Sequence, residues 1–185
     1  MNTYLQLEEV ITMTSTKTKD IVMTALMAAL VFVATYLIRI PNPATGGYSH
    51  LGDCMIFLAV VLIGRRNGAL AAAVGGGLSD FLAGAPIWIL PTLVIKFTMA
   101  FIMGTIIKSN PESRKLQLTG AVTGGLFQVA AYTLVNMILF GKEAGLLSIP
   151  NETLQTAFGV IIFVILSVAL SKSLLKYMKK QGIAK

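Results

Sequence analysis

The segment AAAVGGGLSDFLAGAPIWILPTLVIK, residues 71–96, is almost wholly apolar, yet it contains Asp80 and ends at Lys96. The whole chain is 55% hydrophobic and only 12% charged, whereas an ordinary soluble domain carries about 25% charged residues. A helix needs roughly 20 apolar residues to cross a bilayer, and several runs approach or exceed that length. We therefore predict an all-α integral membrane protein, a single bundle whose backbone hydrogen bonds are satisfied within its helices.

The apolar runs predict six transmembrane helices. We expect them at 21–38, 51–64, 69–82, 88–107, 116–140 and 153–171, with extended loops at 39–50 and 141–152. The second and third are short, and a re-entrant hairpin is the alternative for them. That alternative would place Arg65 and Arg66 in the bilayer, which favours six spans. The expected organisation is a polar segment at 1–17, a membrane domain at 18–180 and a basic tail at 181–185.

The distribution of positive charge predicts the orientation. With both termini in the cytoplasm, twelve of the fifteen Lys and Arg residues lie on the cytoplasmic side, as the positive-inside rule requires. They are Lys17, Lys19, Arg65, Arg66, Lys108, Arg114, Lys115, Lys172, Lys176, Lys179, Lys180 and Lys185. The net charge of +7 is then a topology signal, and no nucleic-acid partner is predicted. A single cysteine and a single histidine exclude a zinc site built from several such ligands.

Three ionisable residues lie within the predicted spans. A charge at the centre of a bilayer costs on the order of 3 kcal/mol or more, so such groups face the protein interior or a cavity. Asp53 and Asp80 lie near the outer ends of short helices, where they are candidates for structural ion pairing. Lys96 lies deeper in its helix. It pairs with one of these acids or faces a ligand, and the sequence leaves both alternatives open.

A polar stripe follows one helix, because Gln128, Tyr132 and Asn136 recur at every fourth residue. Such a stripe either forms hydrogen bonds between helices or lines a binding cavity. The Tyr48 and His50 loop is expected to cover the same outer level. Trp88 is either a residue of the interfacial aromatic belt or a surface on which a ring ligand stacks.

Ala25 and Ala29 form a small-x-x-x-small pair, which lets another helix approach closely in lipid. Internal packing and docking of another subunit both fit this spacing. No catalytic site is predicted, because the chain has neither a G-x-S-x-G nucleophile elbow nor a Walker A phosphate loop.

Three features together resemble the S component, the substrate-binding subunit, of energy-coupling factor (ECF) vitamin transporters, most of all the hydroxymethylpyrimidine/pyridoxine type. They are Ala25-x-x-x-Ala29, the block SHLGDCMIFLAVVLIGRRNGALAAAVGGGLSDFLAG (49–84) and PTLVIK (91–96). The similarity extends over residues 18–180. It implies a multi-pass protein of a prokaryotic cell membrane that binds a vitamin or precursor from outside. The loop between the first two helices would cap the ligand.

The resemblance also implies partners and roles. Ala25 and Ala29 would dock on a membrane T component that carries two cytoplasmic ATPases, and no cofactor is expected. The implied ligand contacts are Tyr48, His50, Trp88, Lys96, Gln128, Tyr132 and Asn136.

Neutral hydrogen-bonding groups and aromatic faces favour an uncharged ring such as pyridoxine or hydroxymethylpyrimidine. A carboxylated ligand would find only Arg39 and Lys96 as cationic partners. An S component for another vitamin (pantothenate, folate or thiamine) and a membrane assembly subunit that transports nothing are the alternatives.

Overall fold

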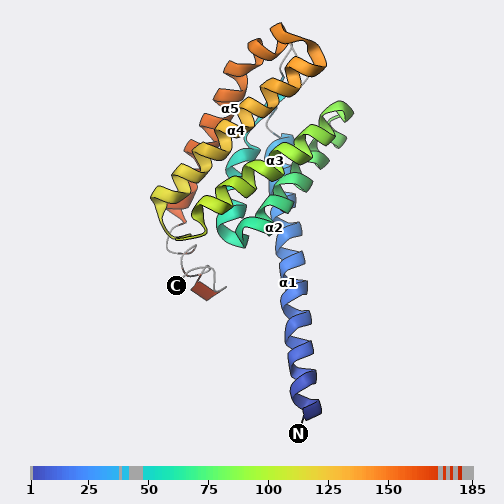
Figure 1. Cartoon of the computed structure of the whole chain (residues 1–185), viewed down its shortest axis with the longest axis vertical. Helices are drawn as coiled ribbons and strands as arrows, with labels where there is room; N and C mark the ends of the chain where they lie inside the picture. The colour runs from blue at the N-terminus through green and yellow to red at the C-terminus, as the bar shows by residue number, and fades with distance from the viewer. Residues whose placement is uncertain are drawn as a thin grey trace.

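A computed structural model describes the backbone of residues 2–37, 39–41 and 48–170, together with 173, 176, 179 and 180. Within these ranges, the side chains of 2–16, 40, 41, 48 and 49 are outside the description. The elements are α1 (Asn2–Leu37), β1 (Arg39–Pro41), β2 (Tyr48–His50), α2 (Gly52–Leu82), α3 (Pro86–Ile107), α4 (Arg114–Phe140) and α5 (Lys142–Ala169). Figure 1 shows α2 to α5 as a helical bundle, with α1 beside it and extending beyond one end.

The helical class is confirmed. All five of these helices are long and apolar enough to cross a membrane. Their outward faces carry large apolar side chains, such as Leu90 at 70% exposed and Ile138 at 72% exposed. Such faces suit contact with lipid, because a helix in a bilayer needs no polar outer surface.

The predicted second and third helices are two arms of α2. Gly64 breaks the helix with non-helical backbone angles, φ 78° and ψ 177°. A Cβ added at Gly68 would lie 2.7 Å from the Cα of Val60, whereas residues eight apart in a straight helix are roughly 12 Å apart. The chain therefore reverses sharply at the predicted GRRNG turn. Because the described residues form five long helices, the prediction of six transmembrane helices is not confirmed.

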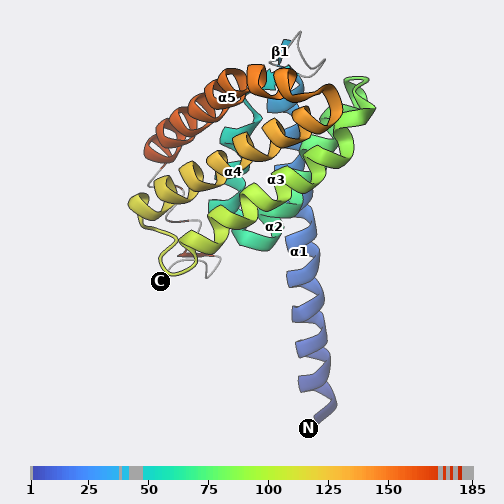
Figure 2. The ribbon, with the colours of Figure 1, turned by 45° about the horizontal axis from the view of Figure 1, so that its top comes forward.

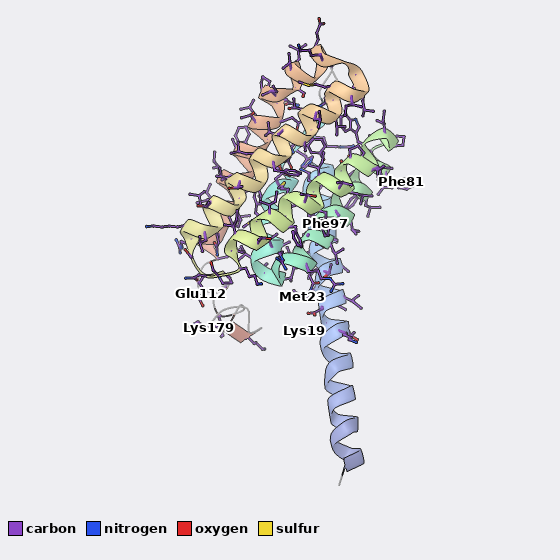
Figure 3. The ribbon with its side chains drawn as sticks, in the orientation of Figure 1. Lys19, Met23, Phe81, Phe97, Glu112 and Lys179 are labelled. Carbon is purple, nitrogen blue, oxygen red and sulfur yellow. The ribbon has the colours of Figure 1, made fainter. Side chains whose placement is uncertain are left out.

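The ends of the bundle differ in the residues they present. Figure 3 places Lys19, Glu112 and Lys179 toward one end of the bundle and Phe81 toward the other. The clustering of basic residues on the cytoplasmic side stays a prediction. The cytoplasmic location of both termini stays a prediction.

Several predicted boundaries are wrong. The expected loop at 141–152 is helical, because Gly141, at φ 93°, turns the chain in one residue and α5 begins directly at Lys142. Pro150 lies inside α5, although proline removes one helical hydrogen bond. The helix α1 begins at Asn2, whereas the candidate membrane span within it begins at Lys17, so the separate polar segment at 1–17 stays a prediction. The tail at 181–185 is outside the described residues.

Glycines allow the helices of the bundle to touch closely. A Cβ at Gly75 of α2 would lie 2.5 Å from the backbone oxygen of Ala28 in α1, and one at Gly124 of α4 would lie 2.7 Å from that of Met99 in α3. Phe57, Met99 and Phe163 belong to the main apolar core. The small residues of α2 and α4 therefore serve internal packing, and they fix the level at which polar side chains of different helices meet.

Candidate functional site

A buried ion pair lies at the centre of the polar side chains. Lys96 Nζ of α3 lies 2.5 Å from Asp53 Oδ1 in the first turn of α2, and both side chains are 0% exposed. Two opposite charges removed from water need each other and further hydrogen bonds. Of the partners that the sequence left open for Lys96, the structure shows Asp53.

Amide and hydroxyl groups from two further helices complete this pair. Gln128 of α4 accepts a hydrogen bond from Lys96 Nζ through Oε1. Its Nε2 donates to Asp53 Oδ2 at 2.7 Å and to Thr156 Oγ1 at 3.1 Å. Gln155 of α5 donates from Nε2 to the same Oδ2 at 3.1 Å. We call Asp53, Lys96, Gln128, Gln155 and Thr156 the polar network; it joins α2, α3, α4 and α5.

His50 connects the network to the strands. Its backbone N–H donates to Gln155 Oε1 at 3.2 Å, and its Nδ1 accepts from the N–H of Gly52 at 3.1 Å. Burial, and then the Lys96 charge, lower the pKa of His50 to about 3, although Asp53 acts in the opposite direction. The imidazole is therefore neutral at physiological pH, with Nδ1 as an acceptor.

An aromatic cluster borders the network. Trp88 of α3 is 7% exposed, and its ring centroid lies 6.1 Å from that of Tyr132 and 5.8 Å from that of Phe140. The Tyr132 hydroxyl lies 2.9 Å from Thr92 Oγ1. Lys96 Nζ is 5.5 Å from the centroid of the Tyr132 ring, within the range of a cation–π contact. Flat apolar rings and the ion pair thus share one region between α3 and α4.

The last member of the stripe, Asn136, lies one turn farther along α4. Its Nδ2 donates to Ser148 Oγ at 3.0 Å, and Ser148 Oγ donates to the backbone oxygen of Gly145 at 2.8 Å. Among the described residues, Asn136 Oδ1 and Thr133 Oγ1 are buried without a hydrogen-bond partner. Buried polar atoms without a hydrogen-bond partner are costly.

The structure brings most of the predicted site residues together. His50, Lys96 and Gln128 belong to or contact the network, whereas Tyr132 and Trp88 form the aromatic cluster. All three residues of the stripe are buried, but they make three separate sets of contacts. The backbone of Tyr48 lies in β2, and its side chain is outside the described residues.

The two acids predicted for structural ion pairing are both buried but lie in different places. Asp53 holds Lys96. Asp80, 6% exposed, lies near the end of α2, and its backbone oxygen accepts from the N–H of Ala85 at 3.0 Å in the turn to α3. The structure therefore assigns the Lys96 pair to the first arm of α2.

The predicted docking pair lies on the outer face of α1. Ala25 and Ala29 are exposed, whereas Met27 and Ala28, between them in the sequence, are 2% and 8% exposed and pack against α2. Ala25 and Ala29 therefore lie outside the buried face through which α1 packs on α2, and their role in docking stays a prediction.

Sequence reasoning missed four residues that contact the candidates: Thr92, Ser148, Gln155 and Thr156. Gln155 and Thr156 are polar residues early in a predicted apolar helix, which is the signal that had identified the α4 stripe. Ser148 was hidden because its segment was predicted to be a loop.

Two comparisons with known proteins bear on the chain. The model of the family described as "ECF-type riboflavin transporter, S component" matches residues 15–172. A protein of Pyrococcus woesei, described as "Uncharacterized protein in gap 3'region", is 40% identical over 132 residues, which cover 71% of this chain and 88% of that protein. The chain therefore belongs to the family of ECF-type riboflavin transporter S components.

Proposed function

We propose that this protein captures an uncharged, planar vitamin beside the polar network, with riboflavin as the first candidate. Its family makes it a substrate-binding subunit of an ECF importer and a multi-pass membrane protein. The identity of the substrate, the ligand contacts and the partner surface are the proposed elements.

We prefer an uncharged ligand mainly because the charge of Lys96 is already neutralised within the protein. Asp53 neutralises Lys96 at 2.5 Å, and the neighbouring His50 is neutral because its pKa is about 3. A carboxylated ligand such as pantothenate or folate would have to compete with Asp53 for the ammonium group. Breaking one half of a buried pair costs about 3–5 kcal/mol, which disfavours that exchange.

The aromatic cluster and its neighbours support a planar ring. Trp88, Tyr132 and Phe140 offer ring faces for offset stacking, and Asn136 and Thr133 offer the unpartnered polar atoms described above. Riboflavin combines a flat heteroaromatic ring, polar ring edges and an uncharged hydroxylated chain. The family description also favours riboflavin. Pyridoxine and hydroxymethylpyrimidine, which the sequence favoured, are the second candidates because they share the uncharged ring.

The exposed Ala25 and Ala29 support the proposed route of delivery. They form a face on α1 that another membrane helix can approach closely, and family membership supports a T component as that partner. Two cytoplasmic ATPases on the T component would supply the energy, so ATP hydrolysis lies outside this chain. The proposed location is the plasma membrane of a prokaryotic cell, with the ligand entering from outside.

Trp88 is the single tryptophan of the chain, so its fluorescence reports on the aromatic cluster alone. The purified protein is titrated with riboflavin, pyridoxine, hydroxymethylpyrimidine and pantothenate, with free tryptophan amide as the control for optical absorption by the ligand. We expect saturable quenching and a higher melting temperature with riboflavin, and neither change with pantothenate. Binding of pantothenate without binding of any uncharged ring would overturn the proposal.

A further inference from the structure

Gln155 contacts both the strands and the ion pair through one amide group. Its Oε1 accepts from the backbone N–H of His50, across 105 residues of sequence. Its Nε2 donates to Asp53 Oδ2, across 102 residues. Because both atoms belong to one planar group, rotation of that amide breaks both hydrogen bonds together.

We call the antiparallel strands β1 and β2 the strand pair. It is held in part by contacts with residues close to it in the sequence, in α1 and α2. Arg39 lies opposite His50 in the pairing, and its guanidinium lies 4.3 Å from the centroid of the Tyr36 ring in α1. On the other side, Gly52 of α2 donates to His50 Nδ1. The bond to Gln155 differs from these supports, since it ties the strand pair to α5. Figure 2 shows β1 at the same end of the molecule as the α4–α5 junction.

Asp53 is fixed independently of Gln155. Lys96 contacts its Oδ1, and Gln128 contacts its Oδ2. Gly159 of α5 allows close approach to it, because an added Cβ there would lie 2.7 Å from the Asp53 Cβ. The carboxylate is thus a rigid anchor, and the Gln155 amide that it orients presents Oε1 toward His50.

We propose that Gln155 is a positioning residue that couples the strand pair to the Lys96–Asp53 ion pair. Asp53 orients the amide, and the amide holds β2 on the bundle. A ligand that draws Asp53 or Gln155 into new hydrogen bonds releases β2, and a ligand that leaves them in place keeps β2 closed. This deepens the proposed function and rests on it where a ligand is concerned, but the coupling itself exists in the ligand-free protein and is tested there.

The test is amide hydrogen exchange, measured by mass spectrometry on the ligand-free protein in detergent. Gln155→Met keeps the length of the side chain and removes both polar atoms. Gln155→Glu keeps an oxygen toward His50 but replaces the donor to Asp53 and adds a carboxyl group beside it. We expect exchange in the peptide covering 48–52 to rise about fivefold or more in both variants, the effect of losing one ordinary hydrogen bond.

Two matched controls separate positioning from general loosening. Gln117→Met changes another buried glutamine, whose Nε2 donates to the backbone oxygen of Pro111, far from the strands in sequence. Thr156→Val removes a hydroxyl that contacts Gln128 in the network but not the strands. We expect exchange at 48–52 to stay within twofold of wild type in both controls.

Three outcomes would overturn the coupling. Unchanged exchange in Gln155→Met shows that the amide does not hold β2. Unchanged exchange in Gln155→Glu shows that the anchor on Asp53 is unnecessary, and this variant, which keeps the shape of the side chain, decides the matter if Gln155→Met does not fold. An equal rise in Thr156→Val assigns the effect to the network as a whole. None of these results depends on riboflavin binding, so failure of the ligand titration and failure of this inference are distinguishable.

Discussion

Lys96 and Asp53 form a contact of 2.5 Å in which neither side chain has any exposed surface. Lys96→Met would remove one charge and leave the other buried. We expect a loss of about 3–5 kcal/mol in unfolding free energy, because an uncompensated buried charge is expensive. Thermal unfolding of the detergent-solubilised protein measures the change.

The double variant Lys96→Met with Asp53→Asn is the control for that prediction. It removes both charges and keeps a side-chain oxygen that can accept from Gln128 and Gln155. We expect the double variant to be more stable than Lys96→Met alone, since contacting residues show strong non-additivity in such cycles. If the two changes add, the pair is not coupled as the geometry indicates.

The neutral state of His50 predicts a pH dependence of stability. In the unfolded chain His50 takes up a proton near pH 6.5, whereas in the folded protein burial lowers its pKa to about 3. The unfolded state therefore binds more protons between these values, so the His50 contribution to stability decreases as pH falls from about 6.5 toward 3. By linkage the loss reaches about 1.4 kcal/mol at pH 5.5.

His50→Asn isolates this effect from the carboxylates that titrate in the same range. Wild type and variant are unfolded at pH 7.5 and pH 5.5, and the two stability differences are compared. The wild type should lose more stability on acidification than the variant does. Equal losses would mean that His50 is protonated in the folded protein.

The exposed face of α1 predicts that substitutions there disrupt assembly with a T component without affecting folding. Ala25→Trp and Ala29→Trp add bulk to exposed positions, so melting temperature and vitamin binding should stay near wild type. Co-purification with a T component should be lost, because close helix approach needs small residues. Leu30→Trp is the matched control, at a position of α1 that is 42% exposed on a different part of its outer surface. Loss of vitamin binding with intact co-purification would contradict the assignment.

The reversal in α2 predicts a rank order for two glycine substitutions. Gly64→Ala meets nothing within 4 Å but forces φ 78° on a residue with a side chain, which costs about 1–3 kcal/mol. Gly68→Ala places its Cβ 2.7 Å from the Cα of Val60, and backbone atoms there cannot move without separating the two arms. We expect the greater loss of unfolding free energy from Gly68→Ala. The opposite order would show that the arms are not in close contact.

The sequence was most informative where one physical requirement dominated. Apolar run lengths predicted the helical membrane class, and four-residue spacing predicted that Gln128, Tyr132 and Asn136 share a buried face. The cost of a charge in lipid predicted that Lys96 needs a partner. The spacing of residues does not show which acid lies beside Lys96, because Asp53 and Asp80 both lie near helix ends.

The sequence predicted a loop that is absent and missed contact residues, among them Ser148 and Gln155. Gly141 and Pro150 predicted a loop between 141 and 152, but a single glycine makes the turn and the helix continues through the proline. That error hid Ser148. Gln155 was inside a predicted helix, yet its role depends on atoms more than 100 residues away in sequence, which periodicity along one helix does not reveal.

The Lys96–Asp53 contact also bears on how the chain enters the membrane during synthesis. Asp53 leaves the ribosome first, and Lys96 follows 43 residues later. A lone charge in a membrane-spanning helix is costly, whereas the Lys96–Asp53 pair is electrically neutral. We therefore expect α2 and α3 to enter the lipid more favourably together than one at a time, because only together do they present a neutral pair.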